Sequence, residues 1–257
     1  MTATEADQTV APEILLPDWP DQPAGVGVAV TTRRGGHSTA PWASLNMGQH
    51  VGDDPERVTA NRDQVRRMLE LPRDPVWLQQ VHGTEVACIR QPEQRPAAAA
   101  DAAYTDCIGV PLCVLTADCL PVVLTNADGT EIGVAHAGWR GLCDGVLENL
   151  VQTFTAAPEQ LLAWLGPAIG PQRFEVGPEV RAAFMAQDAD AAQAFRAGTG
   201  DRWLADIYHL ARQRLQRVGV NRIAGGDFCT LSDTDRFFSY RRDPSTGRMA
   251  TLIWRHP

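Results

Sequence analysis

The residues best placed to do chemistry in this sequence lie on either side of one predicted β-turn. The segment Thr116–Gly141 reads TADCLPVVLTNADGTEIGVAHAGWRG. Its Asp-Gly pair at 128–129 predicts a two-residue hairpin turn, which needs positive φ at both positions. In that register His136 lies opposite Pro121, and Cys119 lies two residues earlier in the same strand. Side chains alternate along a strand, so Cys119 and His136 are diagonal neighbours on one face, about 7–8 Å apart. A thiolate and an imidazole at this separation can bind one metal ion.

His82 is a third candidate ligand. The run from Val76 to Arg90, VWLQQVHGTEVACIR, predicts two strands separated by a turn at the His-Gly pair. A histidine at such a turn is exposed, whereas His209 lies within a predicted helix. None of the six histidines forms a His-x-His or His-x-x-x-His pair, and none of the six cysteines forms a Cys-x-x-Cys pair. A zincin helix and a multi-copper cluster of paired histidines are therefore unsupported.

Arg140 lies where an anion can bind beside these ligands. It belongs to the elbow AHAGWRG, and the apolar spacing from Leu142 to Phe154 predicts a helix that begins in this elbow. The unpaired N–H groups and the dipole of a helix N-terminus favour a bound anion, and a guanidinium adds a formal charge. The elbow at Arg140 is therefore a candidate site for a bound anion.

A second glycine-rich segment carries two more candidate residues. The first predicted strand, Val26–Thr32, runs into the sequence RRGG at 33–36, where the absence of side chains lets a ligand approach the backbone. Arg33 and Asn46 are polar residues in and beside this loop, and loops carry function more often than cores do. Arg33 and Asn46 are therefore candidate contacts for a bound ligand.

The whole chain has the composition of an ordinary acidic globular protein. Its 257 residues carry a formal net charge of −8, and 44% are hydrophobic and 21% charged. This balance argues against nucleic acid or an anionic membrane as a partner. No apolar run approaches the ~20 residues of a membrane span. The acidic start MTATEADQTV is not a secretory signal, so we expect reduced thiols and a cytoplasmic location.

Other elements are predicted around these segments. Residues 1–24 are expected to form a loosely held N-terminal tail, and residues 25–257 a single domain. Helices are predicted over 53–71, 178–187 and 203–218, and a buried strand over 161–165. The sequence DPSTG predicts a hairpin turn between strands at Phe237–Arg241 and Arg248–Trp254.

Seven motifs occur together in this chain: TTRRGG, SLNMG, QQVHG, TADC, AHAGWRG, GPAIGPQRFEVG and FFSYRRDPSTGRMA. In this order they closely resemble the family first called polyphenol oxidase or laccase-domain proteins. Its members are now described as purine nucleoside phosphorylases, and some as peptidoglycan editing factors. The resemblance covers residues ~25–257, and the seven motifs together are far more specific than any one alone.

The resemblance implies an α+β fold in which mixed β-sheets pack together with flanking helices. It implies that His82, Cys119 and His136 bind one zinc ion in an enzyme that acts on a purine nucleoside, with phosphate as co-substrate. For that phosphate we expect a cradle at the helix N-terminus with Arg140, and with Arg33 across the loop. Asn46 is expected to contact the substrate. The activities it implies are phosphorolysis of adenosine, inosine, guanosine and methylthioadenosine, and deamination of adenosine. The chain departs from the family pattern at 172–174, where it has Gln-Arg-Phe and many members carry Cys or Tyr.

Several functions remain open at this point. Three protein ligands leave one position of a tetrahedral zinc ion free, which is the catalytic arrangement. Alternatively, Cys119 is the nucleophile and His136 the base of a hydrolase that edits peptidoglycan precursors. A non-catalytic partner of cell-wall proteins is a third possibility. Copper can occupy such a site in vitro, but the histidines provide no further copper sites for oxidase chemistry. The motif H-x-E…P-C-x-x-C of cytidine-type zinc deaminases is absent, so any deamination would use a different framework.

Overall fold

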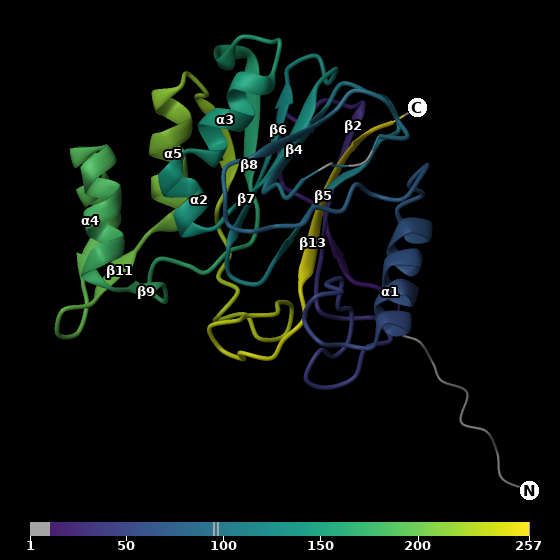
Figure 1. Ribbon diagram of the computed structural model, residues 1–257, viewed down its shortest axis with the longest axis horizontal. Helices are drawn as coiled ribbons and strands as arrows, with labels where there is room; N and C mark the ends of the chain where they lie inside the picture. The colour runs from purple at the N-terminus through teal and green to yellow at the C-terminus, as the bar shows by residue number, and fades with distance from the viewer. Residues whose placement is uncertain (1–10, 95, 97, 257) are drawn as a thin grey trace, which may run out of the picture.

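Two β-sheets form the centre of the molecule, which a computed structural model describes for residues 11–94, 96 and 98–256 (Figure 1). The larger sheet has six strands in the order β12-β8-β6-β7-β4-β3, and the smaller has four in the order β1-β2-β13-β5. The six are β3 (Val86–Ile89), β4 (Ala102–Thr105), β6 (Leu120–Asn126), β7 (Ile132–Ala137), β8 (Leu161–Leu165) and β12 (Arg222–Gly225). The four are β1 (Ile14–Leu15), β2 (Val26–Thr31), β5 (Leu112–Thr116) and β13 (Met249–Arg255).

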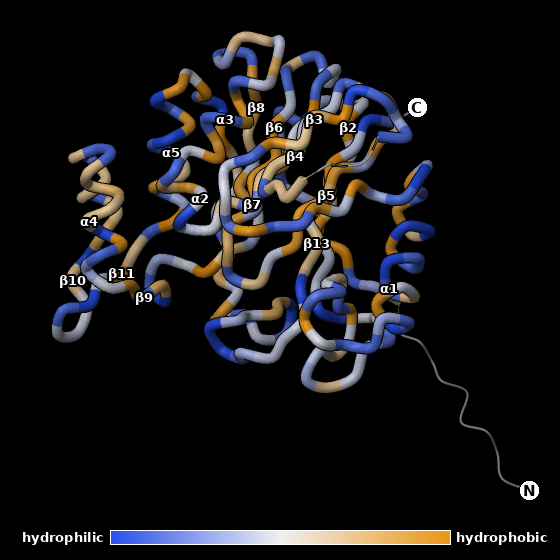
Figure 2. Tube along the Cα trace, viewed as in Figure 1, coloured by the Kyte–Doolittle hydropathy of each residue, from blue (hydrophilic) through white to orange (hydrophobic). Residues whose placement is uncertain are grey.

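Apolar side chains fill the space between the two sheets. Val28 and Ile253 of the four-stranded sheet belong to the same buried cluster as Val123 and Trp164 of the six-stranded sheet. Most central strands are buried along their whole length, so they read as continuous apolar runs rather than as alternating patterns. Figure 2 shows this apolar interior as orange strands beneath largely blue loops.

Helices cover the outer faces of both sheets. Three helices form a second core with the six-stranded sheet: α2 (Trp139–Asp144), α3 (Val146–Thr153) and α5 (Ile207–Arg217). The four-stranded sheet is covered by α1 (Pro55–Met68), whose Val65 packs against Leu252 of β13 and its neighbours. The predicted class, an α+β fold with packed mixed sheets and flanking helices, is confirmed.

A small third sheet lies at one end of the molecule, next to α4 (Figure 1). Its strands run in the order β10-β11-β9 and are antiparallel. The elements of this end and the two short 3₁₀ helices are β9 (Glu175–Val176), α4 (Pro178–Gln187), β10 (Phe195–Ala197), β11 (Trp203–Ala205), η1 (Pro158–Gln160) and η2 (Ala189–Ala194).

The central hairpin has the predicted register but a longer loop. Pro121 pairs with His136, as expected, and the ladder between β6 and β7 ends at the pair Thr125 and Ile132. Beyond that pair the Asn126 carboxamide accepts the N–H groups of residues 130 and 131 and closes the loop. Of the two predicted turn residues only Gly129 has positive φ. A side-chain cap thus replaces the tight two-residue turn without shifting the ladder.

The helix predicted from Leu142 to Phe154 is two helices. Gly145 ends α2 and begins α3 with a φ of 104°, a left-handed conformation that glycine adopts without a steric penalty from Cβ. As a result α2 begins directly after the His136 strand, as predicted, but spans only six residues. A helix this short aligns few peptide dipoles, so its contribution to anion binding is smaller than expected.

Two predictions in the C-terminal third are wrong. Residues 203–218 are not one helix: Trp203–Ala205 is β11, and α5 starts after Asp206, whose carboxylate caps the helix by accepting the N–H of His209. Phe237–Arg241 is not a strand. Both edges of β13 are already paired, with β2 and with β5, so DPSTG cannot join it to a third strand.

The predicted N-terminal tail is partly docked on the domain. Within 1–24 the structure describes residues 11–24, where Ile14–Leu15 pairs with β2 and Trp19 is buried. Between Val76 and Arg90, where two strands were expected, only Val86–Ile89 is a strand. No helix in the described part of the chain is long and apolar enough to cross a membrane.

Candidate metal centre

Three side chains that are distant in the sequence converge on one point. His82 comes from the loop before β3, Cys119 from the bend between β5 and β6, and His136 from β7. One ligand atom from each lies within 4.8 Å of the others. Cys119 Sγ is 3.8 Å from His82 Nε2, and the two imidazole rings meet edge to face with centroids 4.7 Å apart. The structure thus brings together the three residues that the sequence singled out.

Asp101 holds two of these side chains in place. Its buried carboxylate accepts the N–H groups of Val81, His82 and Gly83 at 3.0, 2.9 and 2.7 Å. His82 has a φ of 60°, which is costly for a residue other than glycine and which these hydrogen bonds stabilise. The same carboxylate lies 2.7 Å from His136 Nδ1, which leaves Nε2 of that ring as the nitrogen available to a ligand.

The charges in this group move the pKa values of Cys119 and His136 in opposite directions. Burial alone would raise the pKa of the Cys119 thiol, but the charge and hydrogen bond of His136, together with His82, outweigh burial and lower that pKa to about 6. Burial alone would lower the pKa of His136, but Cys119 and Asp101 raise it to about 9. The protein by itself favours a thiolate beside an imidazolium at neutral pH, so a bound metal ion must replace the imidazolium proton.

The residue before Cys119 is strained and firmly held. Asp118 has a φ of 90°. Its carboxylate accepts the hydroxyls of Thr230 and Ser239 at 2.6 and 3.0 Å, and the N–H of Arg241 at 2.7 Å. These bonds tie the Cys119 bend to the segment 230–241. Strain that the surroundings support in this way is characteristic of functional sites.

Two glycines let the elbow after His136 approach the ligands closely. A Cβ at Gly138 would lie 2.9 Å from His82 Cδ2 and 3.1 Å from Cys119 Sγ. A Cβ at Gly141 would lie 2.6 Å from the carbonyl oxygen of Gly83. Gly138 has an ordinary φ of −60°, so the missing side chain, not an unusual conformation, is what this position requires. The glycines of AHAGWRG therefore make room for the ligand cluster.

A cavity of about 170 Å³ opens beside Cys119. Its walls are mainly apolar and aromatic and come from α2, α5 and the loops around β9 and β13. The lining residues are Ala117, Asp118, Cys119, Trp139, Ile169, Phe174, Ile207, Tyr240 and Arg241. Aromatic walls of this kind can stack on a planar heteroaromatic ring.

The two predicted phosphate ligands occupy different places. Arg140 is exposed and stacks on Trp139, a wall of the cavity, with Cζ 4.4 Å from the ring centroid. Arg33 donates to the carbonyl oxygens of Ala43 and Thr234 at 3.2 Å and lines a separate hollow together with Arg242. The structure places Arg140, but not Arg33, beside the cavity at Cys119.

Asn46 is fully buried, and its carboxamide is completely used within the protein. Nδ2 donates to the Gly48 carbonyl at 3.1 Å and to Asp53 Oδ2 at 2.9 Å. Oδ1 accepts the N–H groups of Gly48 and Arg248, each at 2.9 Å. No donor or acceptor is left for a ligand, so the predicted substrate contact by Asn46 has no support here. Asn46 instead fixes the segment that carries Arg248.

The donor set fits one metal ion with an open coordination position. Two imidazole nitrogens and a thiolate suit zinc, and bonds of about 2.0–2.3 Å in a tetrahedron require ligand atoms roughly 3.5 Å apart. The separation of 3.8 Å between Cys119 Sγ and His82 Nε2 is close to that value. Asp101 supplies the carboxylate that commonly orients a metal-binding histidine. Three protein ligands leave a position for a substrate atom or water.

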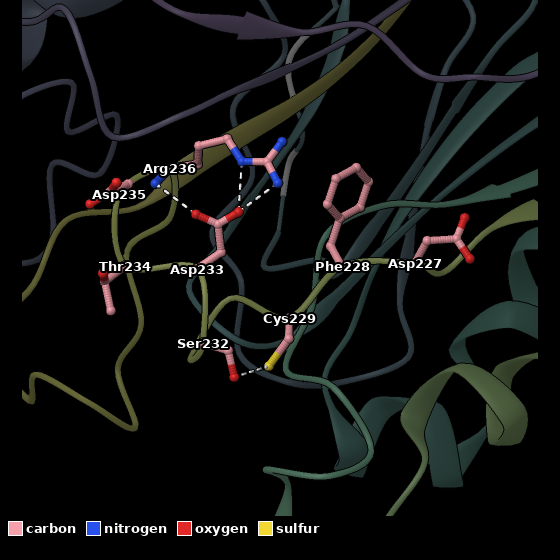
Figure 3. Close-up of a pocket in the computed structure, with 8 residues that line it drawn as sticks. All are labelled: Asp227, Phe228, Cys229, Ser232, Asp233, Thr234, Asp235 and Arg236. Carbon is pink, nitrogen blue, oxygen red and sulfur yellow. Dashed lines mark hydrogen bonds and ion pairs between the residues drawn. The ribbon is translucent and has the colours of Figure 1, made fainter.

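A second and larger hollow, of about 460 Å³, surrounds Cys229 (Figure 3). Its polar groups pair with one another: Cys229 Sγ lies 3.3 Å from the Ser232 hydroxyl, and the Asp233 carboxylate accepts Arg236 Nε at 2.6 Å. Phe228 forms part of the wall, and no histidine lines the hollow. Although Asp227, Asp233 and Asp235 also line it, Cys229 belongs to no cluster of metal-ligand atoms in the described part of the chain.

Three residues that hold or border the candidate site were not identified from the sequence. Asp118 lies inside the TADC motif, so a signal for it was present. Arg248 lies inside TGRMA, and the interpretation of that segment as a hairpin strand hid it. Asp101 carries no local signal, because its partners His82 and His136 are brought to it only by the pairing of β4 with β7 and β3.

Known proteins resemble this chain along nearly all of its length. Residues 27–256 match the family described as multi-copper polyphenol oxidoreductase laccase. A protein of Escherichia coli K12 named purine nucleoside phosphorylase YfiH is 54% identical, over 94% of this chain and 98% of that protein. A Pseudomonas aeruginosa protein named purine nucleoside phosphorylase is 50% identical, over 93% and 97%.

Solved structures share the fold. The crystal structure of a Neisseria meningitidis protein superposes with a TM-score of 0.89 at 44% identity, covering 95% of this chain and 99% of that one. YlmD from Geobacillus stearothermophilus gives a TM-score of 0.82 at 32% identity, covering 91% and 93%. The likeness therefore extends to the arrangement of the sheets that position the three ligands.

Proposed function

Because the chain belongs to the multi-copper polyphenol oxidoreductase laccase family, we propose that within it this protein acts as a zinc-dependent purine nucleoside phosphorylase. The observation that carries the proposal is the convergence of His82, Cys119 and His136 beside an aromatic cavity. The names of the bacterial relatives support the reaction type. Copper is a possible occupant in vitro, since the same donors bind it.

The proposed reaction exchanges one bond at the ribose. A phosphate oxygen forms a bond to C1′ as the bond from C1′ to the purine nitrogen breaks, and the departing base takes up a proton. The products are the free base and ribose 1-phosphate. The aromatic walls Trp139, Phe174 and Tyr240 would hold the base by stacking. When bound, the metal ion supplies Lewis-acid stabilisation of developing negative charge.

Arg140 is our proposed contact for one face of the phosphate. Its guanidinium stacks on Trp139 and forms no ion pair or hydrogen bond within the described part of the chain, so its donors are free for a ligand. The proposed substrates are adenosine, inosine, guanosine and methylthioadenosine. Deamination of adenosine, in which water attacks the purine ring, is a further activity proposed for the same site.

A product assay paired with metal analysis tests this function. Protein purified without added metal is expected to contain about one zinc ion per chain. Incubated with inosine and phosphate, it should release hypoxanthine and ribose 1-phosphate in equal amounts and only when phosphate is present. Two results would reject the phosphorylase function. One is release of the base at the same rate with and without phosphate, and the other is zinc-loaded protein that releases no base from any of the four nucleosides. Inosine formed from adenosine without phosphate would identify the deaminase activity.

One observation favours a second candidate, a Cys–His hydrolase. Cys119 contacts His136, and His136 in turn contacts the Asp101 carboxylate. The pKa of the Cys119 thiol is also lowered. A cysteine nucleophile with a base and an orienting carboxylate has the same arrangement. Such an enzyme would edit a peptidoglycan precursor. The two functions make opposite demands on Cys119, because a metal-bound thiolate is protected and a nucleophile must stay reactive.

A further inference from the structure

Arg248 lies next to residues that line the cavity at Cys119, just before a strand of the four-stranded sheet. β13 pairs with β5 so that Met249 lies opposite Thr116, and one further step of this register puts Arg248 opposite Ala117, a lining residue. The Cζ atom of Arg248 lies 5.8 Å from the ring centroid of Tyr240, another wall of the cavity. Arg248 therefore approaches the site from a different side than Arg140, which approaches through α2.

The charge of Arg248 is not balanced by an ion pair. Its side chain is half-buried, and within the described residues no carboxylate pairs with it. The nearby Asp118 carboxylate is already occupied by two hydroxyls and an N–H group. Partial burial and the positive charges of Arg248 and Arg62 lower the pKa of His50. Burial also lowers the pKa of Arg248 itself, whereas Cys119 and Asp118 act to raise it. A partly buried cation without an ion-pair partner favours an anionic ligand.

The guanidinium is held in place with part of its fork free. The Arg248 N–H donates to Asn46, and Nη1 donates to the carbonyl oxygens of Thr246 and Gly247 at 3.0 Å. Its stem lies against Gly48, where a Cβ would come within 2.9 Å of Arg248 Cγ. Nε and Nη2 have no hydrogen-bond partner in the part of the chain that the structure describes. Two adjacent free donors in one plane match two oxygens of a phosphate.

We propose that Arg248 binds the phosphate co-substrate through Nε and Nη2, with Asn46 as the residue that positions it. The identity of the anion rests on the proposed phosphorylase function, whereas the presence of an oxyanion subsite does not. In this arrangement the phosphate lies between the guanidinium and the ligand cluster at Cys119, next to a nucleoside stacked in the aromatic cavity. The phosphate group of a nucleotide offers the same oxygens, so the test separates the two sources.

The proposal can be tested without turnover by measuring how inorganic phosphate changes the Tm of the zinc-loaded protein. A ligand that binds the folded state raises Tm, so the dependence of Tm on phosphate concentration reports its affinity. Arg248→Met should weaken the apparent phosphate affinity by roughly tenfold or more, and Arg248→Lys by less, since lysine keeps the charge without the planar fork. Arg222→Met is the matched control, because Arg222 is exposed and pairs with Asp21 away from the cavity. It should bind phosphate as the wild type does. Zinc content should be unchanged in all three variants. Because Arg248→Met also loses the hydrogen bonds to Thr246 and Gly247, the rise in Tm with phosphate is measured against each variant's own Tm without phosphate.

Three outcomes would overturn the proposal. The first is zinc-loaded wild-type protein that does not bind phosphate, and the second is Arg248→Met that binds it normally. The third is AMP that binds more tightly than adenosine, competes with phosphate, and loses this advantage in Arg248→Met. That result would assign the subsite to an esterified phosphate. Phosphate binding that depends on Arg248 in a protein without phosphorolysis would leave the subsite standing and reject the proposed function. The second outcome, combined with loss of binding in Arg140→Ala, would move the subsite to α2.

Discussion

Two cysteines of this protein have lowered pKa values, and they lie in very different surroundings. Around Cys119 the pKa is lowered against burial by two histidines, whose nitrogens carry lone pairs. Around Cys229 burial again acts to raise the pKa, but the Ser232 hydroxyl and backbone N–H groups such as that of Gly170 lower it. These neighbours are a hydroxyl and backbone N–H groups, and no imidazole is among them. Of the two hollows, the one beside Cys229 is larger, but only Cys119 lies in a cluster with two histidines.

The comparison shows that neither a large hollow nor an acidic thiol identifies a metal centre. What distinguishes Cys119 is that its neighbours are themselves ligands and are oriented by a buried carboxylate, Asp101. Hydrogen-bond donors also stabilise a thiolate, but a backbone N–H group cannot bind a metal ion. The chemistry of the two cysteines should therefore diverge once metal is present.

The largest expected difference is between the two alanine variants. Cys119→Ala removes one of three ligands, so zinc should be lost on dialysis and phosphorolysis should fall by more than roughly 100-fold, the upper range for losing even an outer-shell partner. Cys229→Ala should keep both zinc and activity. Zinc by mass spectrometry and initial rates on inosine provide the measurement. Stoichiometric zinc in Cys119→Ala would mean that the ligand assignment is wrong.

The next effect comes from the carboxylate behind the ligands. Asp101→Asn keeps the size of the side chain but turns an NH₂ group toward donors, so it cannot satisfy three N–H groups and His136 Nδ1 together. Zinc affinity should drop roughly 10–100-fold, measured by competition with a chelator. The reactivity of Cys229 should not change. Unaltered zinc affinity in a folded variant would show that Asp101 stabilises only the loop at Val81–Gly83 and does not orient the metal ligands.

A smaller effect is expected from one added methyl group. Gly138→Ala would put Cβ within 2.9 Å of His82 and 3.1 Å of Cys119, in an ordinary backbone conformation, so the ligands must move apart. We expect zinc to bind roughly tenfold more weakly. Gly25→Ala is the control, because its Cβ would meet nothing within 4 Å. Equal zinc affinities for the two variants would show that the ligand cluster accommodates a methyl group at position 138.

Alkylation by iodoacetamide tests the smallest expected difference, and it needs no substitution in the protein. The lowered pKa of Cys119, about 6, means that its thiolate is present above that pH and is lost as the pH falls through it. In metal-free protein both cysteines should react at pH 7, and Cys119 should slow as the pH drops below about 6. Added zinc should protect Cys119 alone. Rapid modification of Cys119 in zinc-loaded protein would favour the hydrolase.

The local parts of the centre were predictable from the sequence. The register that aligns His136 with Pro121 follows from strand alternation and the position of a turn, and it survives the replacement of a two-residue turn by a loop capped by Asn126. His82 was identifiable because a histidine before glycine at a strand boundary is exposed. These features depend on neighbours in the chain.

Features that depend on tertiary pairing were not predictable. Asp101 acts on His82 and His136 only through the six-stranded sheet, and Asn46 reaches Arg248 from more than half the chain away. The Phe237–Arg241 segment has an apolar, strand-like start, yet β13 is already paired on both edges. Local patterns report which residues can pair but not which edges remain free.

X-ray absorption at the zinc edge tests the central claim most directly. The account predicts a first shell with two imidazole nitrogens at about 2.0 Å and one sulfur at about 2.3 Å, together with one light atom at the open position. This shell should lose its sulfur if zinc is restored to Cys119→Ala. A wild-type spectrum without a sulfur neighbour, or with two, would contradict the assignment of His82, Cys119 and His136 as the metal centre.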